Sequence, residues 1–300
     1  MNVIEIDNLT KYYSTIPAIE DVSISISKGT VFGLIGPNGS GKTTLIRLLI
    51  GLTRPSSGSS FILGKNTATE FSSLTRNVSA VVETPSFFPG LTAVQTLRTL
   101  SDYSGEKSCE RRLCELLELV GLLDARNKKV ERYSLGMKQR LAVAGALLSR
   151  PEVLILDEPT NGLDPTGVME LRSLLLNASS AGTTVFVSSH MLSELERTCS
   201  QVAFIVGGRV KRSGMVTDLL STSMKMKADP AEKALSILRA RFPVFAKEIR
   251  MDGDEIRIPS DFNLSPEVSD DFAANAVTVY EIVNKRLGLE EIFQECVNEV

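Results

Sequence analysis

The sequence has few cysteines, a single histidine and no excess of basic charge. Its four cysteines form no CxxC pair, and with one histidine they offer no convincing set of zinc ligands. We expect reduced, partly buried thiols, as in a cytosolic protein. With 33 basic and 36 acidic residues, the net charge is −3, so no basic surface calls for nucleic acid or anionic lipid. These shortages argue against a zinc site and weaken a DNA-binding interpretation without excluding it.

Long apolar runs are missing as well. No uninterrupted apolar stretch approaches the roughly 20 residues that a membrane helix requires. The first residues, MNVIEIDNLTKYYS, carry acids where a signal peptide has a basic run and an apolar stretch. We therefore expect a chain that cannot cross a bilayer alone. Its 43% of hydrophobic residues can bury a sizeable core, and 300 residues suit one large α/β domain with or without a small appendage.

The order of periodic patterns predicts an α/β sheet interrupted by a helical insertion. Apolar residues cluster or alternate with period two near the N-terminus, which indicates strands. Helical periodicity dominates from about residue 92 to 149. Continuous β-branched runs then return, with a crossover helix between them over VMELRSLLLNAS, as expected for parallel strands buried on both sides. The predicted strands cover 3–6, 22–26, 30–35, 59–63, 78–83, 153–157 and 183–189.

The composition and periodicity of the sequence change after Gly214. Residues 221–230 are polar and end in proline, so we predict a linker there. A helix (AEKALSILRARF), a hairpin around an Asp-Gly turn (EIRMDGDEIRIP), another helix, a strand near VTVYEIV and an amphipathic helix (LEEIFQECV) are expected to follow. The sequence thus predicts a main domain over 1–220 and a small α+β appendage over 221–300.

A glycine-rich turn follows the predicted strand 30–35 and opens a helix. Its sequence, GPNGSGKTT, matches G-x-x-x-x-G-K-[ST], the pattern of a phosphate-binding loop. Glycines let backbone N–H groups surround a polyphosphate, and the helix N-terminus adds its positive dipole end. Lys42 would reach the β- and γ-phosphates, and the Thr43 hydroxyl would bind Mg²⁺. A chance glycine turn is the alternative, against which the flanking strand and helix argue. The candidate nucleotide-binding residues are Gly36, Pro37, Asn38, Gly39, Ser40, Gly41, Lys42, Thr43 and Thr44.

Two acids and the histidine are candidates for chemistry. In VLILDEPT, four apolar residues place Asp157 at the carboxyl end of a buried strand, where it would hold Mg²⁺. Glu158 is then positioned to polarise the attacking water as a general base. Its alternative is a surface acid at a strand end. His190 follows the strand 183–189 and could hydrogen-bond the γ-phosphate, although a lone histidine is more often structural.

A phosphate loop and a strand-end aspartate occur in a broad class of nucleotide-binding proteins. The segment YSLGMKQRL, residues 133–141, indicates a narrower family within that class. It resembles the signature sequence of ABC ATPases, with Ser134 and Gly136 on the matching positions and less common residues at Tyr133, Leu135 and Met137. The order of the other elements over roughly 1–218 is similar to an ABC cassette. This resemblance implies that Tyr13, with Tyr12 as its rival, stacks on adenine. It also implies that Asp164 in NGLDP is the D-loop acid and that His190 is the switch histidine.

One position departs from the family pattern. Where the family has a glutamine that touches Mg²⁺ and the attacking water, this chain has Glu83, in VVETPSFFPGLT. An acid can still bind magnesium, but it adds negative charge beside the γ-phosphate. This segment, YSLGMKQRL and the terminal LEEIF are similar to the bacitracin-resistance and lantibiotic-immunity branch, whose members export peptide antibiotics or lipid-active compounds. The implied metal ligands are Thr43, Glu83 and Asp157.

The resemblance predicts an ABC fold and a motor that needs partners. The fold is a mixed sheet with antiparallel N-terminal strands, a helical subdomain at about 84–150 and the α+β appendage. One phosphate loop and one signature per chain imply an ATPase dimer, a homodimer or a heterodimer, that encloses two ATP head to tail. Integral membrane permease subunits would hold the protein at the inner face of the cell membrane, with the loop from Glu83 to Pro89 as their socket, unless its aromatic residues only pack locally.

Three alternatives stay open at this point. A soluble, non-transport ABC ATPase is one, although only about fifty residues separate Glu83 from Tyr133 and leave no room for the coiled coil of repair types. The ATPase of an importer would share every catalytic residue. A nucleotide sensor without turnover would be expected to lack Glu158 or His190, and both are present.

Overall fold

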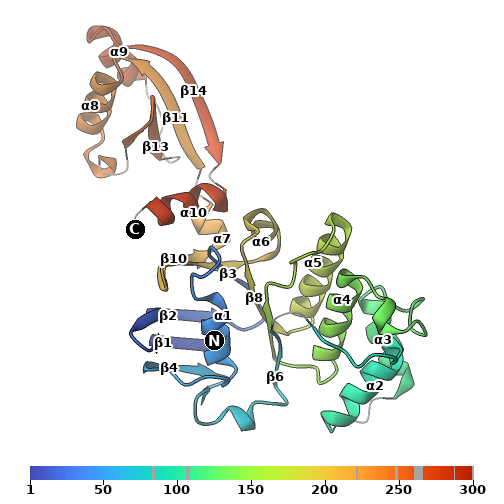
Figure 1. Ribbon diagram of the computed structural model, residues 1–300. Coiled ribbons are helices and arrows are strands. Elements are labelled where there is room, and N and C mark those ends of the chain that lie inside the picture. Colours follow the sequence, from blue (N-terminus) through green and yellow to red (C-terminus); the bar gives the residue numbers. More distant parts are fainter. Residues whose placement is uncertain are drawn as a thin grey trace. The chain divides into compact units, whose positions relative to one another are not determined.

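The computed structural model describes residues 1–82, 85–105, 109–220, 222–246, 249–259, 266–286 and 288–298 (Figure 1). Contacts divide the chain into two compact units. Unit 1 comprises Met1–Val216 and Phe293–Val300, and unit 2 comprises Thr217–Ile292. Within the described part of the chain, no helix is both long enough and apolar enough to cross a membrane.

The centre of unit 1 is a six-stranded sheet with the order β10-β9-β3-β8-β7-β6. All its neighbouring strands run parallel except β10, which pairs antiparallel with β9. Every residue of β3, β7 and β8 is buried, which explains their continuous apolar sequences. The strands are β3 (Val31–Ile35), β6 (Val78–Val81), β7 (Val153–Asp157), β8 (Thr184–Ser189), β9 (Gln201–Val206) and β10 (Arg209–Met215).

A second sheet in unit 1 is antiparallel and has the order β2-β1-β4-β5. Its strands alternate buried and exposed residues, and the register places Ile4 opposite Ile26 and Ile6 opposite Ile24. One apolar core joins this sheet to the helix after β3 and to the six-stranded sheet. The N-terminal strands therefore support the phosphate loop from a sheet of their own. They are β1 (Asn2–Tyr13), β2 (Ile16–Ser27), β4 (Ser57–Ile62) and β5 (Lys65–Asn66).

Helices connect and cover the strands of unit 1. Three of them, α2, α3 and α4, pack against one another between β6 and β7 and form the helical insertion. Thr92 caps α2 in a reciprocal capping box with Gln95. Helix α5 makes the crossover from β7 to β8. The helices are α1 (Lys42–Leu49), α2 (Ala93–Tyr103), α3 (Glu110–Leu119), α4 (Leu135–Ala146), α5 (Pro165–Ser180) and α6 (Leu192–Thr198), with short 3-10 turns at Phe71–Ser73 and Val130–Arg132. The short helix α7 (Val216–Leu219) begins at the last residue of this part of unit 1 and continues into unit 2.

Unit 2 is a split β-α-β arrangement, with two helices and an antiparallel sheet of order β12-β13-β11-β14. The hairpin prediction holds, but Asp252 pairs with Glu255, so Gly253 and Asp254 form the turn rather than Asp-Gly. The elements are β11 (Thr222–Asp229), α8 (Ala231–Arg241), a 3-10 turn (Pro243–Phe245), β12 (Arg250–Asp252), β13 (Glu255–Pro259), α9 (Pro266–Ala274) and β14 (Thr278–Arg286).

The predicted linker over 221–230 is wrong, because Thr222–Asp229 is the inner strand β11. Met226 is fully buried in the core of unit 2, and Met224 packs against that core. Lys225 lies on the other face of the sheet, 2.8 Å from Glu255. The segment is therefore an alternating strand whose polar face carries lysines.

Helix α10 (Leu289–Asn298) begins in unit 2 and ends in unit 1. Within unit 1, the Phe293 ring stacks on Phe204 with ring centroids 6.4 Å apart, and Arg212 lies 3.2 Å from Glu295. The final residues thus belong by contact to unit 1, whereas the predicted appendage extends to residue 300.

Candidate functional site

The loop between β3 and α1 has the backbone that phosphate binding requires. Gly41 has φ +103°, and a Cβ atom there would lie 2.5 Å from the Ala18 carbonyl oxygen. At Gly36, a Cβ would lie 2.4 Å from the Ile205 carbonyl oxygen. No side chain caps α1, so its first-turn N–H groups have no side-chain acceptor. Among the described residues, the buried Ser40 hydroxyl also has no hydrogen-bond partner. Donors without acceptors in one loop suit a polyphosphate.

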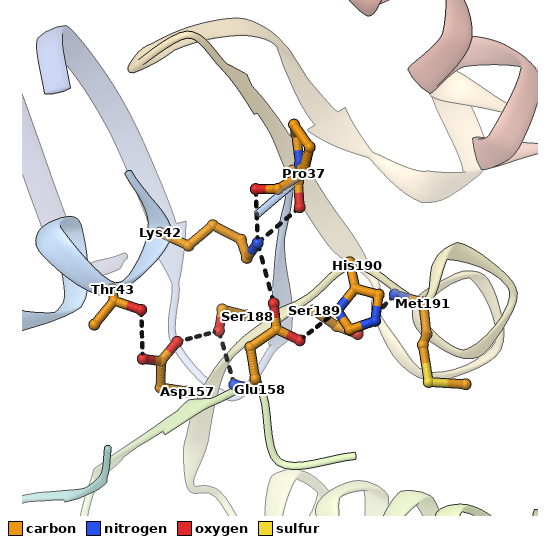
Figure 2. Close-up of polar contacts among 10 residues, drawn as sticks. Pro37, Lys42, Thr43, Asp157, Glu158, Ser188, Ser189, His190 and Met191 are labelled. Atoms are coloured by element: carbon orange, nitrogen blue, oxygen red, sulfur yellow. Dashed lines mark hydrogen bonds and ion pairs between the residues drawn. The ribbon is translucent and has the colours of Figure 1, made fainter. Parts of the chain in front are cut away.

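Lys42, at the start of α1, is held at the mouth of this loop. Its ammonium donates to the carbonyl oxygens of Gly36 at 2.7 Å and Pro37 at 3.1 Å. The same Nζ lies 3.0 Å from Glu158 Oε1, an ion pair without hydrogen-bond geometry (Figure 2). Only 6% of the lysine side chain is exposed, so its ammonium group lies inside the loop rather than in solvent.

Asp157, the last residue of β7, accepts hydrogen bonds through both carboxylate oxygens. The Thr43 hydroxyl donates to Oδ2 at 2.8 Å, and the Ser188 hydroxyl donates to Oδ1 at 2.6 Å. A buried carboxylate next to a hydroxyl offers the hard oxygen ligands that Mg²⁺ prefers, and Mg²⁺ usually completes its shell with phosphates and water. No group of three or more His, Cys, Asp or Glu with metal-binding geometry occurs in the part of the chain that the structure describes. Thr43 and Asp157 would hold the ion here, with phosphate and water oxygens completing its shell.

Glu158 links the two candidate catalytic groups to the phosphate loop. Its Oε2 lies 2.9 Å from His190 Nδ1, and its Oε1 faces Lys42 (Figure 2). The glutamate side chain is 16% exposed and that of His190 is 45% exposed, so water can reach the pair. An acid at the edge of a phosphate cradle, oriented by a histidine, has the placement that a general base needs.

The candidate signature lies at the start of α4. Ser134 is its N-cap and accepts the Met137 N–H at 3.2 Å, and it is solvent-exposed. Tyr133 is 5% exposed and donates its hydroxyl to the Ala125 carbonyl at 2.8 Å. Burial raises the pKa of the Tyr133 phenol. A Cβ at Gly136 would lie 3.3 Å from Leu163. Tyr133, the less common residue at this position, therefore anchors the start of the signature segment in the protein interior, while Ser134 faces solvent.

Asp164 has a structural role in this chain. It is the N-cap of α5 and accepts the Gly167 N–H at 2.9 Å. The loop before it touches the signature segment, because a Cβ at Gly162 would lie 2.4 Å from Leu135 Cδ2. The predicted D-loop and the signature segment thus lie side by side within one chain.

The remaining candidates are less constrained. Tyr12 is 40% exposed and Tyr13 is 46% exposed, and Lys11 Nζ lies 5.3 Å from the Tyr13 ring centroid. Their hairpin runs beside the phosphate loop, since Ala18 of β2 approaches Gly41. Glu83 lies outside the described residues. The sequence predicts a strand over 78–83, and the observed strand β6 ends at Val81.

Sequence reasoning missed Ser188. The structure brings together Lys42, Thr43, Asp157, Glu158 and His190, and Ser188 is bonded to two of them. The available signal was a polar residue that directly follows an apolar run in a buried strand, next to the strand that ends in Asp157.

Comparisons with known proteins point to one family. The family model described as ABC transporter matches residues 19–161. A bacitracin transport ATP-binding protein of Bacillus licheniformis is 36% identical over 295 residues, covering 97% of this chain and 96% of the relative. A lantibiotic transport ATP-binding protein of Streptococcus pyogenes is 38% identical over 208 residues, covering 69% of this chain and 89% of the relative.

Solved structures show the same cassette. A structure of the ATP-binding subunit of an ABC transporter has a TM-score of 0.66 and 32% identity, covering 72% of this chain and 91% of that one. A dimeric ATP-binding cassette in a post-hydrolysis state with ADP and Pi has a TM-score of 0.65 and 25% identity, covering 71% of this chain and 98% of that one. The chain belongs to the ABC transporter family, as an ATP-binding, ATP-hydrolysing subunit.

Proposed function

We propose that the chain hydrolyses ATP at composite sites between two copies arranged head to tail. Lys42 and the loop around it bind the phosphates from one side, and Ser134 of the second copy binds them from the other. Two features support this. Ser134 is exposed at a helix N-terminus, where N–H groups favour an anion. Its hydroxyl oxygen accepts the Met137 N–H of its own helix and stays exposed to solvent.

The arrangement around Glu158 is the observation that carries the catalytic proposal. In this proposal, Thr43 and Asp157 would hold Mg²⁺, which neutralises charge on the phosphates when bound. Glu158 accepts the proton of the attacking water, and His190 orients Glu158 and contacts the γ-phosphate. One carboxylate within about 3 Å of both the phosphate-loop lysine and the histidine supports this division of roles. Tyr13 stacking on adenine, Asp164 acting across the dimer and Glu83 as a third magnesium ligand are parts of the same proposal.

The transport part of the proposal concerns partners. We propose that the dimer powers export through separate membrane permease subunits, at the cytoplasmic face of the membrane. The loop before α2 is the proposed socket, because Phe88 is 63% exposed on a segment rich in proline. Bacitracin and lantibiotic transport in the relatives' names favours a peptide antibiotic or a similar lipid-active compound as cargo. Residues 1–220 form the motor, and 221–300 form an accessory domain in dimer contacts or docking.

Substitution of Glu158 tests the catalytic proposal. Glu158→Gln keeps an oxygen for Lys42 and removes the base, so ATP turnover falls about 100- to 10,000-fold while Mg-ATP still binds. The stalled protein elutes as a dimer in size-exclusion chromatography with Mg-ATP and as a monomer without it. Glu152→Gln is the matched control, since that acid begins the same loop-strand segment but bonds Asn77 away from the phosphate loop. Undiminished turnover in Glu158→Gln removes Glu158 from the base role.

A further inference from the structure

Ser188 is one of three buried polar residues in strand β8, with Thr184 and Ser189. It is fully buried, and the register of the parallel sheet places it opposite Asp157. The preceding residues of the strand, from Val185 to Val187, are all apolar and buried. A buried hydroxyl is retained in such a strand only where it is hydrogen-bonded, and the partners it chooses indicate its role.

Both partners of this hydroxyl are the two acidic residues of the site. The Ser188 hydroxyl donates its one hydrogen to Asp157 Oδ1 at 2.6 Å, and its oxygen accepts the Glu158 backbone N–H at 2.9 Å (Figure 2). Because Thr43 donates to Asp157 Oδ2, the carboxylate is fixed between two hydroxyl groups from different elements. The serine and the threonine together set the plane of the carboxylate.

Glu158 needs this support more than an ordinary residue would. Its φ is +48°, a left-handed conformation that non-glycine residues adopt only where their surroundings hold it. Its N–H is bonded to Ser188, so the hydroxyl holds the backbone at the point where the chain turns out of β7. That turn directs the Glu158 side chain toward Lys42 and His190 (Figure 2).

We infer that Ser188 is a positioning residue that couples the magnesium carboxylate of Asp157 to the backbone of Glu158. The inference rests on the roles proposed above for these two acids and adds a fully buried residue that acts through them. Loss of the hydroxyl frees Asp157 to rotate and leaves the Glu158 N–H without its acceptor. Magnesium affinity and base placement therefore change together, while the Lys42 contacts with the carbonyl oxygens of Gly36 and Pro37 remain.

The test compares Ser188→Ala with Thr184→Val. Thr184 begins the same strand, is equally buried and accepts the Gly29 N–H at 2.9 Å, but it lies at the opposite end of β8 from the site. Binding of the fluorescent nucleotide TNP-ATP is titrated with and without Mg²⁺, and hydrogen exchange of the Glu158 amide is followed. For Ser188→Ala, we expect about a tenfold or greater rise in the Mg²⁺ concentration for half-saturation, faster Glu158 exchange and unchanged binding without Mg²⁺. For Thr184→Val, all three stay at wild-type values.

Each result decides between a positioning role and simple packing. Equal shifts in the two variants, or wild-type magnesium dependence in Ser188→Ala, overturn the inference. A third variant, Asp157→Asn, distinguishes failure of this inference from failure of the proposed function. If Asp157→Asn loses the magnesium dependence and Ser188→Ala does not, only the role of Ser188 is wrong. If Asp157→Asn keeps it, the assignment of magnesium to Asp157 is wrong.

Discussion

Replacing Gly41 by alanine tests whether the phosphate loop is held against the N-terminal sheet. Gly41 has φ +103°, so any L-residue there is strained by about 1–2 kcal/mol. Its new Cβ would also lie 2.5 Å from the Ala18 carbonyl oxygen and 2.6 Å from Ile19 Cγ2. Both atoms belong to β2, which is paired with β1 and cannot move freely. Overpacking of this kind adds about 1–3 kcal/mol.

Gly182 provides a matched control for the strain. Its φ is +101°, nearly that of Gly41, but a Cβ there meets nothing within 4 Å. Gly182→Ala therefore lowers the free energy of unfolding only through backbone strain. The difference in this free energy between the two variants measures the contact with β2. We expect the free energy of unfolding to fall by about 1–3 kcal/mol more in Gly41→Ala than in Gly182→Ala.

The assay is urea unfolding followed by circular dichroism, with binding of TNP-ATP measured on the folded proteins. Gly41→Ala should also weaken nucleotide binding, because relief of the clash displaces the N-terminus of α1. Gly182→Ala should bind as the wild type does, since that residue follows α5. Equal losses of stability in the two variants would refute the claim that β2 braces the loop.

Two further predictions concern the signature and unit 2. Tyr133→Phe removes the hydroxyl that donates to Ala125 at 2.8 Å, which should lower the free energy of unfolding in urea by about 1–2 kcal/mol; an unchanged value would show that the phenol is not an anchor. Met226→Ser, in the core of unit 2, should cost about 2–5 kcal/mol, whereas Lys225→Ser on the opposite face should cost under 1 kcal/mol. Similar losses in this last pair would contradict the strand assignment of 222–229.

Local patterns predicted the parts of the site that lie on one segment. A strand, a glycine-rich turn and a helix follow one another along the chain, so the phosphate loop could be read from consecutive residues. Four apolar residues likewise placed Asp157 at a strand end. Ser188 could not be found in this way, because its role depends on the register between β7 and β8.

The segment 222–229 shows a different difficulty. Its core-facing positions are occupied by methionines and alanine, and lysines alternate with them, so the segment looked like a polar linker. The strand becomes evident only when Met226 enters the core between the strands and helices of unit 2. The end of α10 is similar, since an amphipathic pattern does not tell whether Phe293 packs on Phe204 or on the appendage.

The central claim is that Lys42 of one copy and Ser134 of another act on the same triphosphate. Lys42→Ala and Ser134→Arg should each abolish ATP hydrolysis when purified alone. When the two variants are mixed in equal amounts, half of the dimers are mixed and each mixed dimer has one intact site, so about a quarter of wild-type activity should return. Full activity of Ser134→Arg alone, or no recovery from dimers shown by pull-down to contain both variants, would contradict the claim.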